Sequence, residues 1–155
     1  MNKRHDRPDK ERVVVTGVGM ATPLGTGREE FSRRLFQGES AVDAVQAFDT
    51  GGAASHLGAE VRGFEPREWI SVKNLRRMDR LSMLTTASAR LALSDAGITV
   101  KAENRDRVGI LFGSAFGATD VTVQFEDALL AQGPGSVNPI LVPNTVMNAP
   151  AGHAS

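Results

Sequence analysis

Residues 12–25 contain the first pattern that could bind a ligand, a valine-rich run followed by closely spaced glycines. Gly17 and Gly19 stand where a dinucleotide-binding βαβ unit receives a pyrophosphate on backbone N–H groups at a helix N-terminus. The full fingerprint requires Gly or Ala at its sixth position, where this chain has Thr22. The next helix also begins too late, after Thr26, and no acidic residue ends a strand about 20 residues further on. We therefore expect no NAD(P) site and assign the glycines to a tight turn.

Nucleophilic and metal-based chemistry are limited by the composition. The 155 residues include no cysteine, which excludes disulfides, cysteine metal sites and a thiol nucleophile from this sequence. The histidines, His5, His56 and His153, lack the short spacing of a metal-binding pair. A serine hydroxyl would need an adjacent general base, and no Ser–His pairing is indicated. We expect no metal and no bound cofactor, and we interpret His153 as a helix-end or interface residue in preference to a chemical one.

Charge and hydropathy exclude several partners. The 18 Lys and Arg balance 18 Asp and Glu, so no overall field attracts nucleic acid or an anionic membrane. No run approaches the roughly 18 apolar residues that span a membrane. Residues 1–11 mix charges of both signs without an apolar stretch, which predicts a disordered tail and no signal peptide. We expect a cytoplasmic protein in which residues 12–155 form one globular domain or part of one.

The strands that must position any site are predicted from short apolar runs. Val13–Val18 and Val108–Phe112 are unbroken and rich in aliphatic residues, as is typical of central strands covered on both faces. A shorter strand is expected over Ala59–Phe64, after a surface excursion at residues 39–58 that has no sustained period. If Val108–Phe112 normally pairs with a strand outside this chain, the chain alone exposes a flat apolar strand edge. Such an edge favours aggregation, so we expect this chain to be poorly soluble alone.

Three helices separate these strands, and local signals mark their ends. Thr26 begins a capping-box pattern, while Gly38 and Gly97 suit the positions just after a helix. The predicted helices cover residues 27–37, residues 79–96, and a segment from a cap at Thr119 or Asp120 to Gly133. Alternating strands and helices predict an α/β fold with a largely parallel central sheet.

Six segments, taken in order, resemble the N-terminal half of β-ketoacyl-acyl carrier protein synthases. They are VVVTGVGMATPLG at 13–25, FDT at 48–50, RRMDR at 76–80, ALSDAGI at 92–98, RVGILFGSAFG at 107–117 and VPNTVMNAPAGHAS at 142–155. The likeness is strongest to the synthase II type of bacterial fatty acid synthesis and to type II polyketide ketosynthases. It implies a thiolase-like αβαβα fold of two similar halves, of which residues 12–155 form most of the first.

The same resemblance implies the chemistry. Family members accept an acyl group on a cysteine thiolate from a carrier-protein thioester, and two histidines assist decarboxylation of malonyl carrier protein and the condensation that follows. All three residues lie later than Ser155 in such enzymes, so no catalytic residue is assigned here and the chain is predicted not to catalyse condensation by itself. The acyl chain would arrive on the phosphopantetheine of an acyl carrier protein, with no further cofactor.

The resemblance assigns three sets of site residues. Lys73, Arg76 and Arg77 match basic positions that dock the acidic carrier protein, although clustered basic residues before a helix can also be a solvated helix start. Phe116, Gly117 and Ala118 match the loop beside the acyl pocket. There a phenylalanine in place of an aliphatic residue is expected to restrict acyl length, or only to pack against a neighbouring helix.

The third set is a proline-bracketed aliphatic segment. Ile140, Leu141 and Val142 match a segment that reaches across the homodimer interface of the family, although a loop covering the core would read the same way. We therefore expect a homodimer, or a heterodimer with a ketosynthase, when the protein is full length. The favoured function is part of an active ketosynthase. The alternatives are part of a noncatalytic subunit resembling a chain-length factor, and an inactive truncated fragment.

Overall fold

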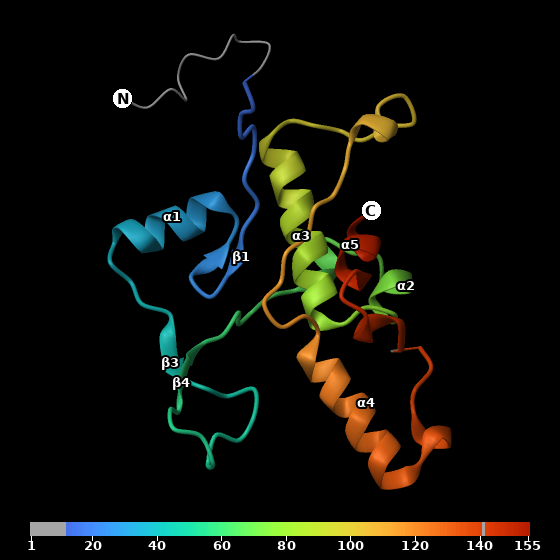
Figure 1. The fold of residues 1–155 in the computed structure, drawn as a ribbon. Coiled ribbons are helices and arrows are strands. Elements are labelled where there is room, and N and C mark those ends of the chain that lie inside the picture. The colour runs from blue at the N-terminus through green and yellow to red at the C-terminus, as the bar shows by residue number, and fades with distance from the viewer. Residues whose placement is uncertain (1–11, 141) are drawn as a thin grey trace, which may run out of the picture.

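The computed structural model describes residues 12–140 and 142–155, and the predicted disordered tail at residues 1–11 lies outside these residues. In chain order, the elements are β1 (Ala21–Thr22), β2 (Gly25–Thr26), α1 (Arg28–Phe36), β3 (Val42–Ala44), β4 (Leu57–Ala59), η3 (Pro66–Glu68), α2 (Val72–Leu75), α3 (Arg80–Asp95), η4 (Arg105–Arg107), α4 (Thr119–Gln132), η5 (Pro134–Ser136), η6 (Val142–Thr145) and α5 (Ala149–Ala154). The arrangement is open, with α3 at the centre, α5 beside it, and α1 and the β3–β4 hairpin to one side (Figure 1).

Helix α3 is the element around which the C-terminal part of the chain packs. The Asp79 carboxylate caps its first turn by accepting hydrogen bonds from Leu81 N at 3.1 Å and Ser82 N at 3.3 Å. Gly97 follows its last turn with a φ of 66°, in the left-handed region that favours glycine. Both ends are set by local side-chain and backbone preferences, and the helix predicted here is confirmed.

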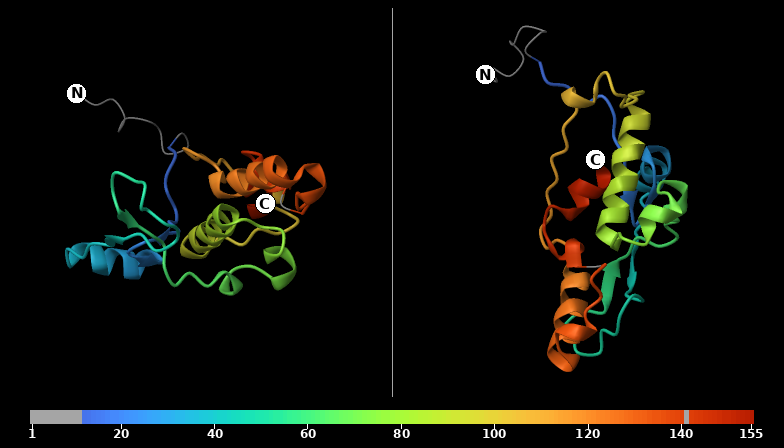
Figure 2. Two further views of the ribbon diagram at one scale, coloured as in Figure 1. Left: turned by 90° about the horizontal axis from the view of Figure 1, so that it is seen from below. Right: turned by 90° about the vertical axis from the view of Figure 1, so that its right-hand side faces the viewer.

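The buried core is small, and most of it lies at or next to α3, against which α5 packs (Figure 2). The buried apolar side chains are Ile70, Met78, Ala87 and Val121. On α3 itself, Ala87 is accompanied by two buried polar residues, Ser82 and Thr86. Helix α3 is therefore buried on one face only.

Helices α1 and α4 occupy the predicted ranges, but their first residues differ from the expected caps. Helix α1 begins after Gly27 without a side-chain cap, because Thr26 is paired within the β1–β2 hairpin. Helix α4 begins after Ala118, and the Thr119 hydroxyl donates to the carbonyl oxygen of Phe116 at 2.9 Å. The predicted caps at Thr26 and at Thr119 or Asp120 are therefore wrong, while the helices themselves are confirmed.

The described residues contain two small antiparallel sheets, β1–β2 and β3–β4, and no parallel pair. The expected strands at Val13–Val18 and Val108–Phe112 run through the structure without a strand partner among these residues. Val13 is 95% exposed and Leu111 is 98% exposed. A strand is defined by ladder hydrogen bonds to a neighbour, so these two segments do not form the expected parallel layer by themselves.

The surface excursion at residues 39–58 is confirmed as exposed chain, and it carries β3 and most of β4. Asp43 lies opposite Gly58 in this antiparallel pair. The strand predicted at Ala59–Phe64 lies instead at Leu57–Ala59, because pairing with β3 sets its position. A propensity-based prediction from one segment could not include that register.

Gly17 and Gly19 serve close packing and do not form the tight turn expected of them. A Cβ atom at Gly17 would collide with the Ala92 carbonyl of α3, and one at Gly19 would collide with the Ser88 carbonyl. Val18, between them, donates its backbone N–H to the Asp95 carboxylate at 2.9 Å. The glycines therefore let this segment lie directly against the backbone of α3.

Candidate functional site

The three predicted docking residues lie together on exposed chain around α2. This helix has four residues, and its turn is closed by hydrogen bonds from Asn74 N and Leu75 N to the Ser71 carbonyl at 2.9 and 3.1 Å. Lys73 lies in the helix, Arg76 is its C-cap, and Arg77 follows in the turn before α3. Local helix geometry therefore gathers the three cations at one end of α3.

A groove of about 490 Å³ runs between these cations and a distant segment. It is lined by Val72, Lys73, Arg76, Arg77 and Ile140. Within the described residues, no carboxylate lies within ion-pair distance of the three cations. The chain has a net charge of zero, so the groove is a local positive site. Such a site attracts an acidic partner at short range.

The predicted interface segment meets the groove at Ile140, which is 55% exposed. Its backbone N–H is held by the Asn138 side-chain oxygen at 3.0 Å. Val142 begins η6 and is 40% exposed, while Leu141 lies outside the described residues. The sequence analysis predicted the docking residues and this segment as two separate sites. In the structure, Ile140 of the segment lines the same groove as the docking residues.

The loop predicted to border an acyl pocket has a defined backbone. Gly117 N donates to the Ser114 hydroxyl at 2.9 Å, and Gly117 has a φ of 65°. The backbone conformation therefore favours glycine at this position, and a Cβ atom there would lie 2.8 Å from the sulfur of the exposed Met147 side chain. Ala118 is the N-cap of α4, and Phe116 is 85% exposed. Phe116 therefore does not pack against a neighbouring helix, and its role in a pocket stays a prediction.

A buried polar connection behind the groove was not predicted. Asn144, in η6, is 1% exposed, and its Nδ2 donates to the carbonyl oxygen of Arg77 at 2.9 Å. Its Oδ1 lies 2.9 Å from Nε2 of His153 on α5. His153 is thus a hydrogen-bonded helix residue, in line with the structural interpretation. The sequence around Asn144, between a proline and a threonine, reads as an ordinary turn and gives no signal of burial.

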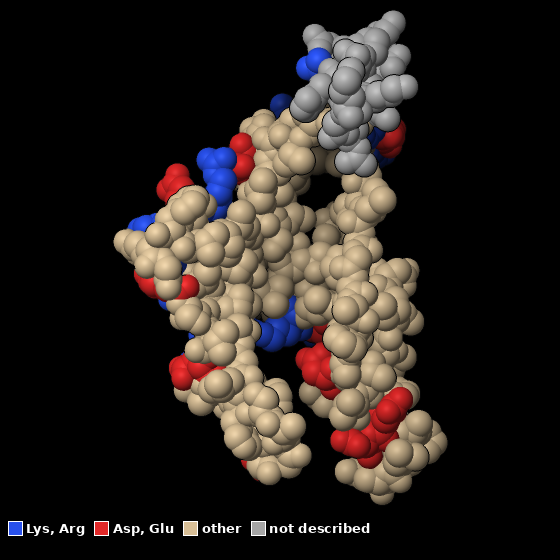
Figure 3. All heavy atoms as spheres, turned by 60° about the vertical axis from the view of Figure 1, so that its left-hand side comes forward, with Lys and Arg blue, Asp and Glu red and all other residues tan. Residues whose placement is uncertain are grey.

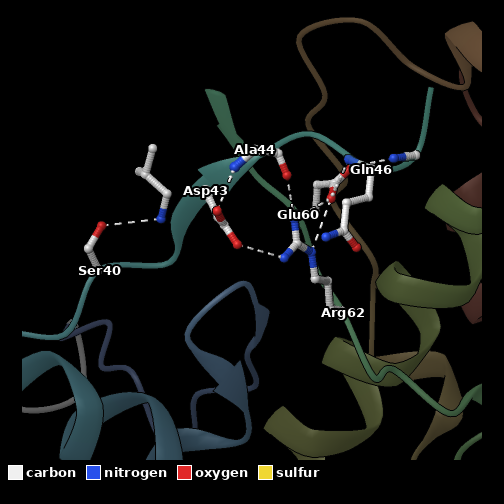
Figure 4. Close-up of polar contacts among 8 residues, drawn as sticks. Ser40, Asp43, Ala44, Gln46, Glu60 and Arg62 are labelled. Atoms are coloured by element: carbon white, nitrogen blue, oxygen red, sulfur yellow. Dashed lines mark hydrogen bonds and ion pairs between the residues drawn. The ribbon is translucent and has the colours of Figure 1, made fainter. Parts of the chain in front are cut away.

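The strongest charge cluster lies on the β3–β4 hairpin, away from the groove, and is centred on Arg62 (Figure 4). The Arg62 guanidinium donates to Asp43 at 3.1 Å, to Glu60 at 2.9 Å and to the Ala44 carbonyl at 2.7 Å. The Ala44 N–H and then Arg62 lower the pKa of Asp43. The Ala47 N–H and then Arg62 lower the pKa of Glu60. All these groups bind one another, so the cluster is a clamp for the hairpin.

Other kinds of site are not found in the described residues. No group of three or more His, Asp or Glu side chains between residues 12 and 155, residue 141 apart, is arranged to hold a metal ion. Over the same residues, no helix combines the length and apolar character needed to cross a bilayer. On the face drawn in Figure 3, charged side chains occupy only a small part of the visible surface.

Comparisons with known proteins agree on one family. Residues 10–155 match the family described as "Beta-ketoacyl synthase, N-terminal domain". The 3-oxoacyl-[acyl-carrier-protein] synthase 2 of Vibrio cholerae is 36% identical over 146 residues, which are 94% of this chain and 35% of that protein. The chain thus spans about a third of this relative's length.

Two solved structures share the fold. The ishigamide ketosynthase/chain length factor has a TM-score of 0.76 and 30% identity, over 91% of this chain and 35% of that one. A β-ketoacyl synthase from Burkholderia phymatum has a TM-score of 0.77 and 30% identity, over 93% of this chain and 36% of that one. These likenesses confirm the predicted α/β, thiolase-like fold class, with this chain lying in its N-terminal half.

Proposed function

The chain belongs to the β-ketoacyl synthase family through its N-terminal domain, and from this premise we propose that it is the carrier-docking part of a 3-oxoacyl-[acyl-carrier-protein] synthase. Such an enzyme condenses an acyl group with a malonyl unit held on acyl carrier protein, in fatty acid or polyketide biosynthesis. The name of the Vibrio cholerae relative supports the reaction. The partners in this proposal are acyl carrier protein and, for the complete enzyme in the cytoplasm, a second synthase subunit.

The groove of Lys73, Arg76 and Arg77 carries the proposal. Three exposed cations, with no carboxylate of the described residues within ion-pair distance, surround a recess of about 490 Å³, and Val72 and Ile140 add apolar contact area. An acidic carrier would be steered by the charges and held by the apolar rim. Because the cations are exposed, salt should weaken their attraction for the carrier.

Carrier binding tests this role directly. The change is Lys73→Glu, alone and with Arg76→Glu, and the matched control is Lys101→Glu, an exposed lysine beyond the far end of α3. The 16 residues of α3 place that end roughly 24 Å from the docking end. We expect the double variant to bind acyl carrier protein about tenfold more weakly, mainly through a slower association rate. Titration calorimetry and stopped-flow binding at two salt concentrations measure both quantities.

The control decides whether the effect is local. Lys101→Glu changes the net charge as much as Lys73→Glu does, and it should bind the carrier as the unaltered chain does. Equal weakening by the two substitutions would show a general charge effect and would contradict docking at the groove. Binding by the double variant that matches the unaltered chain would contradict it as well.

The condensation step is proposed to depend on residues other than these 155. The sequence contains no cysteine, and a serine hydroxyl without an adjacent base is a poor substitute for a thiolate. We therefore expect the chain, given acyl and malonyl carrier proteins, to form no 3-oxoacyl product. Mass spectrometry of the carrier-bound acyl group detects such a product, whose appearance would overturn this expectation.

Two further roles are proposed for the complete enzyme. Phe116 is proposed to limit acyl length, so Phe116→Ala should shift the product distribution toward longer chains, and an unchanged distribution would contradict this role. Ile140, Leu141 and Val142 are proposed to line a dimer interface, an idea supported by the exposure of Ile140 and Val142. Sedimentation of an Ile140→Asp variant should then show more monomer than sedimentation of the unaltered enzyme.

A further inference from the structure

Asn144 is a fully enclosed polar side chain in a chain that buries little else. It is the largest fully buried side chain among the described residues. A buried amide costs free energy unless hydrogen bonds replace those it made to water. Asn144 meets this requirement through two segments that are far apart in sequence, the turn at Arg77 and helix α5 at His153. One side chain therefore joins the docking groove to α5.

The hydrogen-bond chemistry fixes the direction of both contacts. The Arg77 carbonyl can only accept, so the Asn144 atom facing it is the NH2 group. The other amide atom is then the carbonyl oxygen, which also only accepts, so Nε2 of His153 must carry the proton that it donates. The ring orientation and the tautomer of His153 thus depend on where Asn144 is held.

The backbone of the turn that carries Arg77 makes two hydrogen bonds within the turn. Arg77 N donates to the Asn74 carbonyl at 3.0 Å, and Met78 N donates to the Leu75 carbonyl at 3.2 Å. Within the described residues, no backbone N–H donates to the Arg77 carbonyl, which leaves Asn144 as its partner. A helix as short as α2 gains little stability by itself. Asn144 therefore helps to position Arg77 in the groove, together with the buried Met78 that follows it.

We propose that Asn144 is a positioning residue that couples the Arg77 turn of the docking groove to His153 on α5, so that a carrier docked in the groove changes the environment of His153. The identity of the docked ligand rests on the proposed function, while the coupling itself rests on the two hydrogen bonds. Coupling of this kind is reciprocal, so a change at His153 also changes affinity at the groove.

Nitrogen NMR of the histidine rings tests the coupling with acyl carrier protein as the titrant. In the unaltered chain, the His153 ring signals should report a protonated Nε2 and should shift on carrier binding. His56 lies on the hairpin with Nδ1 at 3.0 Å from the Thr50 hydroxyl, and its signals should stay fixed. Asn144→Ala should weaken carrier binding about fivefold and remove the response of His153. Asn148→Ala, at an exposed asparagine whose side chain makes no capping hydrogen bond to α5, is the matched control and should change neither.

A conservative replacement separates positioning from a general loss of structure. His153→Gln keeps an N–H donor for Asn144 and should bind the carrier as the unaltered chain does, whereas His153→Ala should bind about as weakly as Asn144→Ala. Combining Asn144→Ala with His153→Ala should add no further loss, because both remove the same connection. If Asn144→Ala does not fold, the two His153 variants still decide the question. Equal binding by His153→Ala and the unaltered chain would overturn the proposal.

A measurement without carrier distinguishes this proposal from the proposed function. The backbone amide signals of Arg76 and Arg77 should shift in His153→Ala and should not shift in His153→Gln. If these shifts occur and the unaltered chain does not bind carrier, the coupling is supported and the carrier-docking function is wrong. If the amide signals of Arg77 are the same in both variants, the coupling is wrong whatever the chain binds.

Discussion

The region around α3 and the β3–β4 hairpin are stabilised by opposite kinds of contact. Around α3, Met78 is buried and Asn144 is enclosed with both of its hydrogen bonds made. On the hairpin, Val42 and Leu57 are 58% and 64% exposed, and Arg62 holds the strands through surface ion pairs. Burial depends little on salt or on pH near neutrality, whereas exposed ion pairs are weak and screened.

This difference indicates which region controls the docking groove. Arg76 and Arg77 lead directly into α3, and the Arg77 carbonyl is bonded to Asn144. The hairpin contributes no residue to the lining of the groove. Changes in the α3 region should therefore alter both stability and docking, while changes in the hairpin should remain local.

The largest expected effect comes from removing a buried side chain beside α3. Met78→Ala leaves a cavity and should lower the free energy of unfolding by about 3 kcal/mol. Leu57→Ala on the exposed hairpin should change it by less than about 0.5 kcal/mol. Urea unfolding followed by circular dichroism measures both. Equal losses would mean that the two regions are not stabilised differently.

A smaller effect is expected at the first turn of α3. Asp79→Ala removes the acceptor for Leu81 N and Ser82 N, and it should cost about 1 kcal/mol of unfolding free energy. Asp127→Ala is the control, since Asp127 is exposed within α4. The same urea titration applies to both variants, and a loss at Asp127 as large as that at Asp79 would contradict the capping role.

The smallest effect on the whole chain is expected from pH, and it should be confined to the hairpin. The pKa values of Asp43 and Glu60 are lowered in the folded chain, so their contribution is complete above the ordinary carboxyl pKa of about 4. This contribution to the stability of the hairpin is lost as the pH falls below about 4 and through the lowered pKa values of the two carboxyl groups. Hydrogen exchange of the Ala47 amide should accelerate, relative to its intrinsic rate, only below about pH 4.

Arg62→Gln provides the comparison for this pH dependence. Removing the guanidinium should accelerate exchange of the Ala47 amide already at neutral pH, because Glu60 then loses its ion pair. Exchange within α3 should be the same in both proteins. Faster exchange in α3 on acidification alone, in step with the hairpin, would show that the two regions unfold together.

Local signals made the helices predictable. A carboxylate at Asp79 and a glycine at position 97 mark the two ends of α3, and both act within a few residues of where they stand. The strands were less predictable, because a strand requires partners that its own residues do not specify. The runs at 13–18 and 108–112 have strand composition and no ladder in the described residues, whereas the weakly marked Leu57–Ala59 is paired.

Only part of the candidate site could be predicted. The positions of Lys73, Arg76 and Arg77 before a helix were evident, and the structure adds that they share a groove with Ile140. Asn144 was missed, because its burial results from contacts with residues 67 and 9 positions away. Neither the composition of the chain nor the spacing of its apolar residues indicates that these three segments contact one another.

The contact of Gly17 and Gly19 with α3 also limits how this chain can vary. Every amino acid other than glycine carries a Cβ atom, and at these positions that atom would collide with a carbonyl of α3. No missense change in either codon preserves the contact, however conservative its chemistry. A Cβ atom at Gly52, by contrast, would have open space around it, so this position is free of the constraint. Amino-acid substitutions should therefore accumulate slowly at the two glycines and faster on the hairpin loop.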